Sequence, residues 1–364
     1  MRARLPRRLF DAVLLAVVLS PFHALAQPGI EPLRLLQRSP VPQRHTAATD
    51  IRWASEDSVY ISWEVDGVAE VGLDGTRKRA AVPDRKALDQ LNFYSQIAVS
   101  PEVLAVGSES RGVSWRLRKT DPRDGILFHF QPLGDLMDFD VAGGRLLLLG
   151  LAKREAPFAP QGEIAWIGPL ESGAQGLKPI LRDAAGPGAA SYYNCRNYPM
   201  GAVRFLADGS FVIAPGFQDG VHLFSADGKK VRSWSNAELG VNSHLGCAGM
   251  SEEEEAKFRL DETWRKRWAM SHTVIDDILP LPQGPGLLLR SWGRDNQAHW
   301  TLKVLESRAI RTYPVPVTGR RPLDRLQGDV RNGRIALLLL NNSPGATSPE
   351  DVRAEVFVLE SPKP

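Results

Sequence analysis

The densest group of side chains suited to recognition lies in one short segment, SYYNCRNYPMG. Positions 192–198 combine tyrosine rings, asparagine amides, an arginine and a cysteine. Tyrosine rings offer rigid contact area and amides orient a ligand by hydrogen bonding, so the segment predicts a binding site for a peptide or a carbohydrate. A structural loop whose tyrosines cover the core is the alternative. The predicted ligand contacts in this segment are Tyr192, Tyr193, Asn194, Arg196, Asn197 and Tyr198.

A second group of candidates lies further along the chain. His272 precedes the acidic pair Asp276–Asp277, and a histidine near carboxylates suits general base chemistry or a metal. Helix caps and turn contacts explain the same residues. Arg290, Trp292 and Arg294 alternate along one segment and would share one face of a regular strand. We therefore predict His272, Arg290 and Trp292 as ligand contacts, with packing between sheets as the alternative for the arginines and the tryptophan.

The sequence contains no motif of a known catalytic centre: HExxH, GxSxG, CxxC, a P-loop and an EF-hand loop are all missing from it. The histidines after residue 26 never fall two to five residues apart, so no local metal-binding cluster is predicted. We expect no catalytic residue and no cofactor. Enzymatic activity stays open, because residues distant in sequence can form a site that no motif reveals.

The N-terminus has the order of a cleavable secretory signal. A cationic start, MRARLPRRLF, precedes the apolar run Ala12–Leu19 and the small residues around Ala24 and Ala26. The apolar run is far shorter than the roughly 20 residues that span a bilayer. We therefore predict a signal peptide over 1–26, cleavage after Ala26, and a periplasmic or secreted bacterial protein with no membrane span. Arg7 and Arg8 leave a twin-arginine route open, although Asp11 favours the ordinary one.

The charge balance argues against nucleic-acid binding. The chain of 364 residues has 45 Lys and Arg and 42 Asp and Glu, of which four and one lie in residues 1–26, leaving 41 of each. A nucleic-acid binder needs a surplus of cations to displace counterions. The two cysteines, Cys195 and Cys247, fit an oxidising compartment, and we predict that they form a disulfide.

Beyond residue 50 one pattern recurs along the chain. A short apolar strand leads into a small turn, a second strand follows, and after a polar loop another strand often ends in Asp-Gly or Gly-Pro. The Asp-Gly pairs at 208–209 and 227–228 suit tight hairpins, and Leu146–Leu149 suits a strand buried on both faces. The copies cover residues 50–75, 96–122, 138–170, 202–234, 276–307 and 327–361.

With its Asp-Gly turns and strand ends such as HLFSADGKKVRSW, the sequence resembles the six-bladed β-propellers of the NHL and TolB-like kind. The resemblance concerns the fold, since no complete blade signature is present. It implies an all-β, six-bladed propeller of four-stranded antiparallel blades. A seven-bladed ring or a pair of sandwiches is the alternative.

The predicted domain organisation is a single propeller over 27–364 with insertions at about 171–200 and 235–275. The second insertion predicts a helix near 251–270, capped by Ser251 and with Glu252–Glu255 at its start. Residues Leu33–Leu36 are predicted to add a strand to the last blade and close the ring.

Two functions follow from these observations. The first is a non-enzymatic exported propeller that binds a peptide, a glycan or an envelope protein through one face of its ring. The second resembles the propeller lactonases, hydrolases that hold one divalent cation in the channel. It requires carboxylates to converge from the strand starts of several blades, and the acidic residues near such starts are Asp50, Asp138, Asp276, Asp277 and Asp329.

Overall fold

The structure is a computed structural model of the chain. It describes residues 31–42, 46–64, 66–82, 96–108, 112–117, 128–130, 135–151, 162–182, 201–247, 253, 261–340 and 354–363. Contacts within the chain divide it into two units, Met1–Glu31 and Pro32–Pro364, and the description below concerns the second.

The described residues of this unit form six four-stranded antiparallel sheets. The first sheet along the chain contains β2 (Ala48–Trp53), β3 (Ser58–Trp63), β4 (Gly67–Gly72) and β5 (Arg77–Val82). The second contains β6 (Gln96–Val99), β7 (Val103–Ser108), β8 (Gly112–Leu117) and β9 (Phe128–Phe130). The third contains β10 (Asp135–Ala142), β11 (Arg145–Leu151), β12 (Glu163–Pro169) and β13 (Lys178–Arg182).

The remaining sheets follow the same order. The fourth contains β14 (Ala202–Phe205), β15 (Phe211–Ala214), β16 (Val221–Phe224) and β17 (Lys230–Trp234). The fifth contains β18 (Val274–Leu281), β19 (Gly284–Trp292), β20 (Ala298–Leu305) and β21 (Ile310–Gly319). The sixth contains β22 (Arg325–Arg331), β23 (Arg334–Leu340), β24 (Glu355–Glu360) and the N-terminal strand β1 (Leu35–Pro40).

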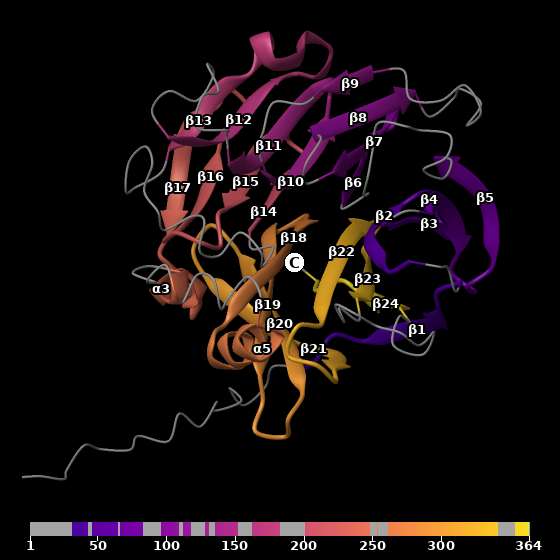
Figure 1. Cartoon of the computed structure of the whole chain (residues 1–364), viewed down its shortest axis with the longest axis vertical. Helices are drawn as coiled ribbons and strands as arrows, with labels where there is room; N and C mark the ends of the chain where they lie inside the picture. Colours follow the sequence, from indigo (N-terminus) through magenta and orange to yellow (C-terminus); the bar gives the residue numbers. More distant parts are fainter. Residues whose placement is uncertain are drawn as a thin grey trace, which may run out of the picture. The chain divides into compact units, whose positions relative to one another are not determined.

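The architecture is an all-β propeller, as predicted. The first strand of each sheet contacts the first strand of the next, and β22 of the sixth sheet contacts β2 of the first (Figure 1). Strand β1 pairs antiparallel with β24, so the sixth sheet joins the two ends of the unit. This confirms the predicted closing strand, which begins two residues later than expected. Pairing of the two ends removes an open sheet edge.

The local sequence explains both turns and strands. Gly209 and Gly228 adopt φ of 80° and 85° in the predicted Asp-Gly turns, a left-handed conformation that glycine adopts without steric cost. Leu146–Leu149 of β11 is fully or almost fully buried, as expected of a strand covered on both faces. Its side chains belong to two apolar clusters. One contains Phe139 of β10 and residues of the second sheet, and the other contains Phe211 of the fourth sheet. Apolar layers between neighbouring sheets are thus the core.

The predicted continuous helix over 251–270 is wrong in its extent. The described helix α5 runs from Glu262 to Ser271 and begins after Asp261, whose backbone is extended and whose carboxylate accepts hydrogen bonds from the N–H groups of Thr263 and Trp264. Asp261 is therefore the N-cap of a separate helix, a role that aspartate fills well. The predicted cap Ser251 lies outside the described residues.

Other elements also lie in the predicted insertions. The segment predicted as the first insertion, 171–200, includes most of the 3-10 helix η3 (Leu170–Gly176) and the whole of β13, the fourth strand of the third sheet. The second, 235–275, contains α2 (Asn236–Leu239), α3 (Ser243–Cys247) and α5. No helix among the described residues is long and apolar enough to cross a bilayer.

Strand order defines two faces of the ring. Within each sheet the chain reverses at every strand, so the links from first to second and from third to fourth strand lie at one end, here called the turn face. The links from second to third strand, and from one sheet to the next, lie at the other end, here called the connection face. The inner strands run parallel, because Asp138 and Asp140 of β10 bind the N–H groups of Val203 and Phe205 in step. All sheets therefore share these faces.

Candidate functional site

The predicted binding segment 192–198 lies outside the described residues, and so does Cys195. The connection that contains it leaves β13 at Arg182 and enters β14 at Ala202, both at the connection face. Cys247 is the last residue of α3, in the connection between the fourth and fifth sheets. The ligand contacts in this segment and the disulfide stay predictions.

His272 follows α5 at the same face. Its ring stacks on Trp268 with centroids 4.6 Å apart, and its Nδ1 lies 2.7 Å from the carbonyl oxygen of Trp268. Trp268 is buried against β14 and β18 residues of the core, which anchors the end of the helix. His272 does not bond to the acidic pair at 276–277, whose partners lie elsewhere. The structure thus places His272 as a capping residue with a half-buried ring.

The three alternating residues Arg290, Trp292 and Arg294 do not share one environment. Arg290 is fully buried, with its Nε 3.6 Å from Oδ1 of Asp276 and its Nη1 donating to the carbonyl of Pro322. Trp292 is half-buried at the strand end, and Arg294 lies in the following turn and is exposed. The predicted shared face therefore fails at Arg294, because the strand ends at Trp292.

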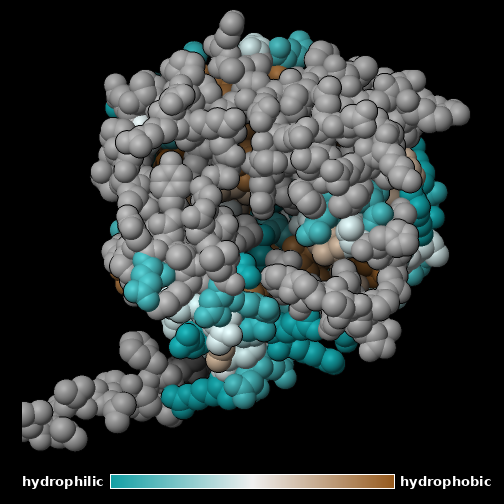
Figure 2. All heavy atoms as spheres, in the orientation of Figure 1, coloured by the Kyte–Doolittle hydropathy of each residue, from teal (hydrophilic) through white to brown (hydrophobic). Residues whose placement is uncertain are grey.

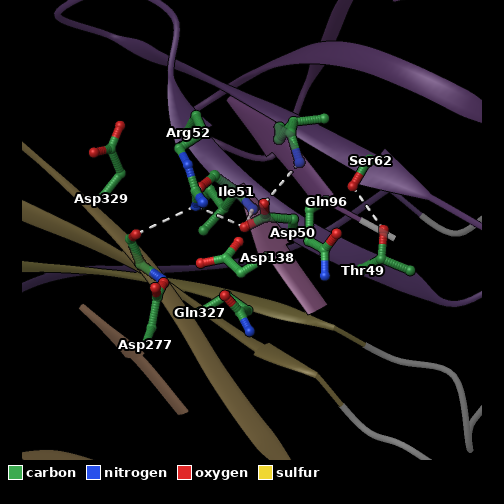
Figure 3. Close-up of polar contacts among 12 residues, drawn as sticks. Thr49, Asp50, Ile51, Arg52, Ser62, Gln96, Asp138, Asp277, Gln327 and Asp329 are labelled. Carbon is green, nitrogen blue, oxygen red and sulfur yellow. Dashed lines mark hydrogen bonds and ion pairs between the residues drawn. The ribbon is translucent and has the colours of Figure 1, made fainter. Parts of the chain in front are cut away.

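Carboxylates do converge on the inner strands: Figure 3 shows Asp50, Asp138 and Asp277 close together, with Arg52 among them. Asp50 and Arg52 come from β2, Asp138 from β10, Arg204 from β14 and Asp277 from β18; we call these five residues the axial cluster. Each is buried, with at most 5% of its surface exposed. Sequence analysis singled out the aspartates but missed Arg52 and Arg204. Their signal is an arginine directly before the aromatic residue of an inner strand, as in DIRW and AVRF.

The inner aspartates join neighbouring sheets by accepting backbone hydrogen bonds. Oδ2 of Asp50 accepts from Ile97 N at 2.8 Å, and Oδ2 of Asp277 accepts from Gly328 N at 2.8 Å. Oδ2 of Asp329 accepts from Trp53 N at 2.8 Å, across the junction between the last sheet and the first. Buried N–H groups without a partner are costly, so these carboxylates stabilise the ring.

Arginines cross-link the same carboxylates. Arg52 Nη1 lies 2.7 Å from Oδ1 of Asp50, and Arg204 Nη2 lies 2.8 Å from Oδ1 of Asp277. Arg204 Nη1 lies 3.3 Å from Oδ2 of Asp138, so one guanidinium spans the third, fourth and fifth sheets. Three buried nitrogen donors in the cluster, Nε and Nη2 of Arg52 and Nε of Arg204, have no hydrogen-bond partner among the described residues.

Burial shapes the protonation of this region. Burial raises the pKa of Asp50, with Arg52 and Arg204 opposing the shift. It raises the pKa of Asp138 to about 7, again against the influence of Arg204. Burial likewise raises the pKa of Asp140 and Asp329, which lie further along their strands towards the turn face. Removal of a carboxylate from water disfavours its charged form, and nearby guanidinium groups offset only part of that effect.

The axial cluster does not fit a divalent cation. Two fixed guanidinium charges already stand among its carboxylates, and both oxygens of Asp50 and Asp277 accept hydrogen bonds. A hard cation prefers several free oxygen ligands around an open position. Over the described ranges, no three His, Cys, Asp or Glu side chains are grouped so that they could hold a metal ion.

The visible surface near α5 and β21 is largely hydrophilic (Figure 2). Arg267, Arg294 and Arg320 are exposed in this part of the chain, and Lys266 is half-exposed and paired with Glu262 at 2.7 Å. The described part of the connection face around the fifth sheet is therefore polar and charged.

Comparisons with known proteins give structural neighbours but no family. No family model matches the chain, and no curated protein matches it. A member of the DUF4221 family from Bacteroides vulgatus is 10% identical over 90% of this chain and 97% of its own, with a TM-score of 0.49. The WD40 β-propeller domain of Doa1 is 8% identical over 91% and 97%, with a TM-score of 0.45. Catalytically inactive virginiamycin B lyase from Staphylococcus aureus with quinupristin is 10% identical over 89% and 98%, with a TM-score of 0.45.

Proposed function

We propose that this protein is an exported propeller, of the six-bladed NHL and TolB-like kind, that binds a peptide, a glycan or an envelope protein without catalysis. The observation that supports this most is the position of the predicted contacts. The connections that contain residues 192–198 and His272 both begin and end at the connection face, on consecutive sheets. Trp292 and Arg294 also stand at that end of the fifth sheet.

The difference between the faces supports the same proposal. On the turn face, most links among the described residues are short, such as Gly143–Gly144 and Asn332–Gly333. On the connection face, the links from β13 to β14 and from β17 to β18 are among the longest in the sequence. Binding residues concentrate on loops that a rigid scaffold positions. We infer that the connection face recognises the ligand, with Trp292 at the end of β19 and Arg290 buried two residues before it on the same strand.

The remaining elements of the proposal come from the sequence. The signal over residues 1–26 sends the chain to the periplasm or the medium with cleavage after Ala26, and the Cys195–Cys247 disulfide fastens the two long connections to each other. Both features suit a protein that works outside the cytoplasm.

The binding proposal is tested on an array of short peptides and oligosaccharides. We compare the wild type with a triple variant, Tyr192→Ala, Tyr193→Ala and Tyr198→Ala, and with Lys229→Ala on the turn face, whose side chain is 84% exposed. The triple variant is expected to lose at least about tenfold in affinity for the array ligands, since such aromatic anchors dominate recognition. The Lys229 control is expected to bind as the wild type does.

Equal affinities in the wild type and the triple variant would contradict the proposed role of these three tyrosines in binding. A wild type that binds nothing on the array would exclude short peptides and glycans and leave an envelope protein as the proposed ligand.

The second candidate is a metal-dependent hydrolase of lactonase type. The convergence of inner carboxylates favours it, whereas the guanidinium groups among them oppose it. A panel of lactones and esters, measured with and without added calcium, zinc or manganese, tests it. Metal-dependent turnover would support the hydrolase and displace the binding proposal.

A further inference from the structure

The axial cluster contains one more acid than it has bases. Asp50, Asp138 and Asp277 face Arg52 and Arg204, so three carboxylates share two guanidinium groups. All five side chains are buried, where an uncompensated charge is far more costly than in water. If every carboxylate were ionised, one negative charge would remain without a counterion.

Hydrogen bonding distinguishes Asp138 from the other two acids. Oδ1 of Asp50 accepts from Arg52 and Ile51 N, and its Oδ2 accepts from Ile97 N. Oδ1 of Asp277 accepts from Arg204 and Ile278 N, and its Oδ2 accepts from Gly328 N.

For Asp138, both bonds reach Oδ2, from Val203 N at 2.8 Å and Arg204 Nη1 at 3.3 Å. Its contact with the arginine is also longer than the 2.8 Å contact between Arg204 and Asp277. Oδ1 of Asp138 is therefore the carboxylate oxygen in the cluster that is open to a proton.

Charged and titratable groups face Asp138 from several strands. Arg204 approaches from β14. Asp277 from β18, and Asp50 and Arg52 from β2, lie around Asp138 in Figure 3. On the side of β6 the neighbouring group is the amide of Gln96, which donates to the carbonyl of Met137. Asp140 lies two residues further along β10, and both of its oxygens already accept backbone N–H groups.

We propose that Asp138 carries a proton in the folded ring and that loss of this proton weakens the junction of the third, fourth and fifth sheets. With the proton in place, two carboxylates balance two guanidinium groups. Without it, Asp138 and Asp277 compete for Arg204 in a buried environment. This inference is independent of the ligand proposed above, because it concerns the stability of the scaffold.

The sign of the pH dependence follows from the proton count. Burial raises the pKa of Asp138 to about 7 in the folded state, whereas the unfolded chain has the ordinary value of 3.8. Between these values the folded protein holds one proton more than the unfolded chain. The stabilisation from this proton is full below the unfolded pKa and is lost as the pH rises through the folded one.

Urea unfolding of the purified protein between pH 5 and pH 8.5 provides the first test. As the pH rises from about 5 to 7, we expect the unfolding equilibrium constant of the wild type to increase by up to about tenfold per pH unit from this group. In Asp138→Asn that component is expected to disappear. Asp208→Asn is the matched control, because Asp208 lies in an exposed turn where its carboxylate accepts hydrogen bonds from the hydroxyl and the N–H of Ser210, which lower its pKa.

The infrared band of a protonated carboxyl provides a second test, because Asp138→Asn removes the contribution of this one acid. In the difference between the spectra of the folded wild type and Asp138→Asn, we expect the band at pH 6 and its loss by pH 9. A difference spectrum without the band at pH 6, or a pH slope that persists in Asp138→Asn, would overturn the proposal. Loss of the slope in Asp50→Asn but not in Asp138→Asn would place the proton on the other acid and overturn it as well.

Discussion

Two junctions of the ring use the same contacts at equivalent positions. Where the third sheet meets the fourth, Asp140 accepts from Phe205 N at 2.8 Å, and Arg145 donates to Gly209 O with its guanidinium 4.9 Å from the ring of Phe205. Where the sixth sheet meets the first, Asp329 accepts from Trp53 N at 2.8 Å, and Arg334 donates to Glu56 O with its guanidinium 5.0 Å from the ring of Trp53.

The two junctions differ in the source of the buried countercharge. Arg204 and Arg52 each precede the aromatic residue of their junction, so they occupy equivalent positions. Arg52 pairs with the carboxylate of Asp50 on its own strand. The equivalent position in β14 is Ala202, which has no carboxylate. Arg204 pairs with two carboxylates from neighbouring sheets, Asp138 and Asp277. In β22 the position equivalent to Asp138 is Gln327, so Arg52 has no such partner from the sixth sheet. Arg52 therefore has its counterion on its own strand, whereas Arg204 links three sheets through its counterions.

Removal of the arginines gives the largest expected effect. Arg204→Met leaves the buried carboxylate of Asp277 without its counterion and Asp138 without its arginine, and is expected to lower the free energy of unfolding by about 3–5 kcal/mol. Arg52→Met leaves only Asp50 without its arginine and is expected to cost less. Urea unfolding of both variants measures the two losses in the free energy of unfolding. Equal losses would show that bridging between sheets adds nothing to a local ion pair.

The equivalent aspartates sharpen the comparison. Asp140→Ala and Asp329→Ala each remove the acceptor of two backbone N–H groups, one on the same strand and one on the next sheet. Each is expected to cost about 1–3 kcal/mol, the usual penalty for buried donors left without partners. Thermal unfolding measured side by side should give similar losses. A difference larger than that range would break the equivalence of the two junctions.

The surface arginines give the smallest expected effect. Arg334 also pairs with Oε2 of Glu56 at 2.9 Å, whereas Arg145 reaches only carbonyl oxygens and a ring among its described partners. Arg334→Ala and Arg145→Ala are each expected to cost about 1 kcal/mol. Because salt screens ion pairs, the cost of Arg334→Ala should shrink between about 0.1 M and 1 M NaCl more than that of Arg145→Ala. An identical salt dependence of the two variants would show that the ion pair between Arg334 and Glu56 does not contribute to stability.

The sequence was sufficient to predict the fold class, the strand repeat and the closing strand. Alternating apolar residues and Asp-Gly turns are local signals, and both Gly209 and Gly228 adopt the conformation that these turns require. The extent of α5 was not predictable from charge alone, since Asp261 caps it at a point that the run of acidic residues obscures.

The buried arginines were missed for a different reason. An arginine in an apolar strand resembles any surface residue of an alternating pattern, and only the closed ring brings Arg204 against Asp138 and Asp277. The five aspartates near strand starts were recognised, but their roles depend on partners far along the chain, such as Ile97, 47 residues from Asp50, and Trp53, 276 residues from Asp329.

The central claim is that the inner carboxylates hold the ring together while the connection face binds the ligand. Elemental analysis of the purified protein after export tests it most directly. The account predicts no stoichiometric metal, because the two guanidinium groups and the proton on Asp138 balance the three axial carboxylates. One equivalent of calcium, zinc or manganese per chain would contradict it and favour the hydrolase.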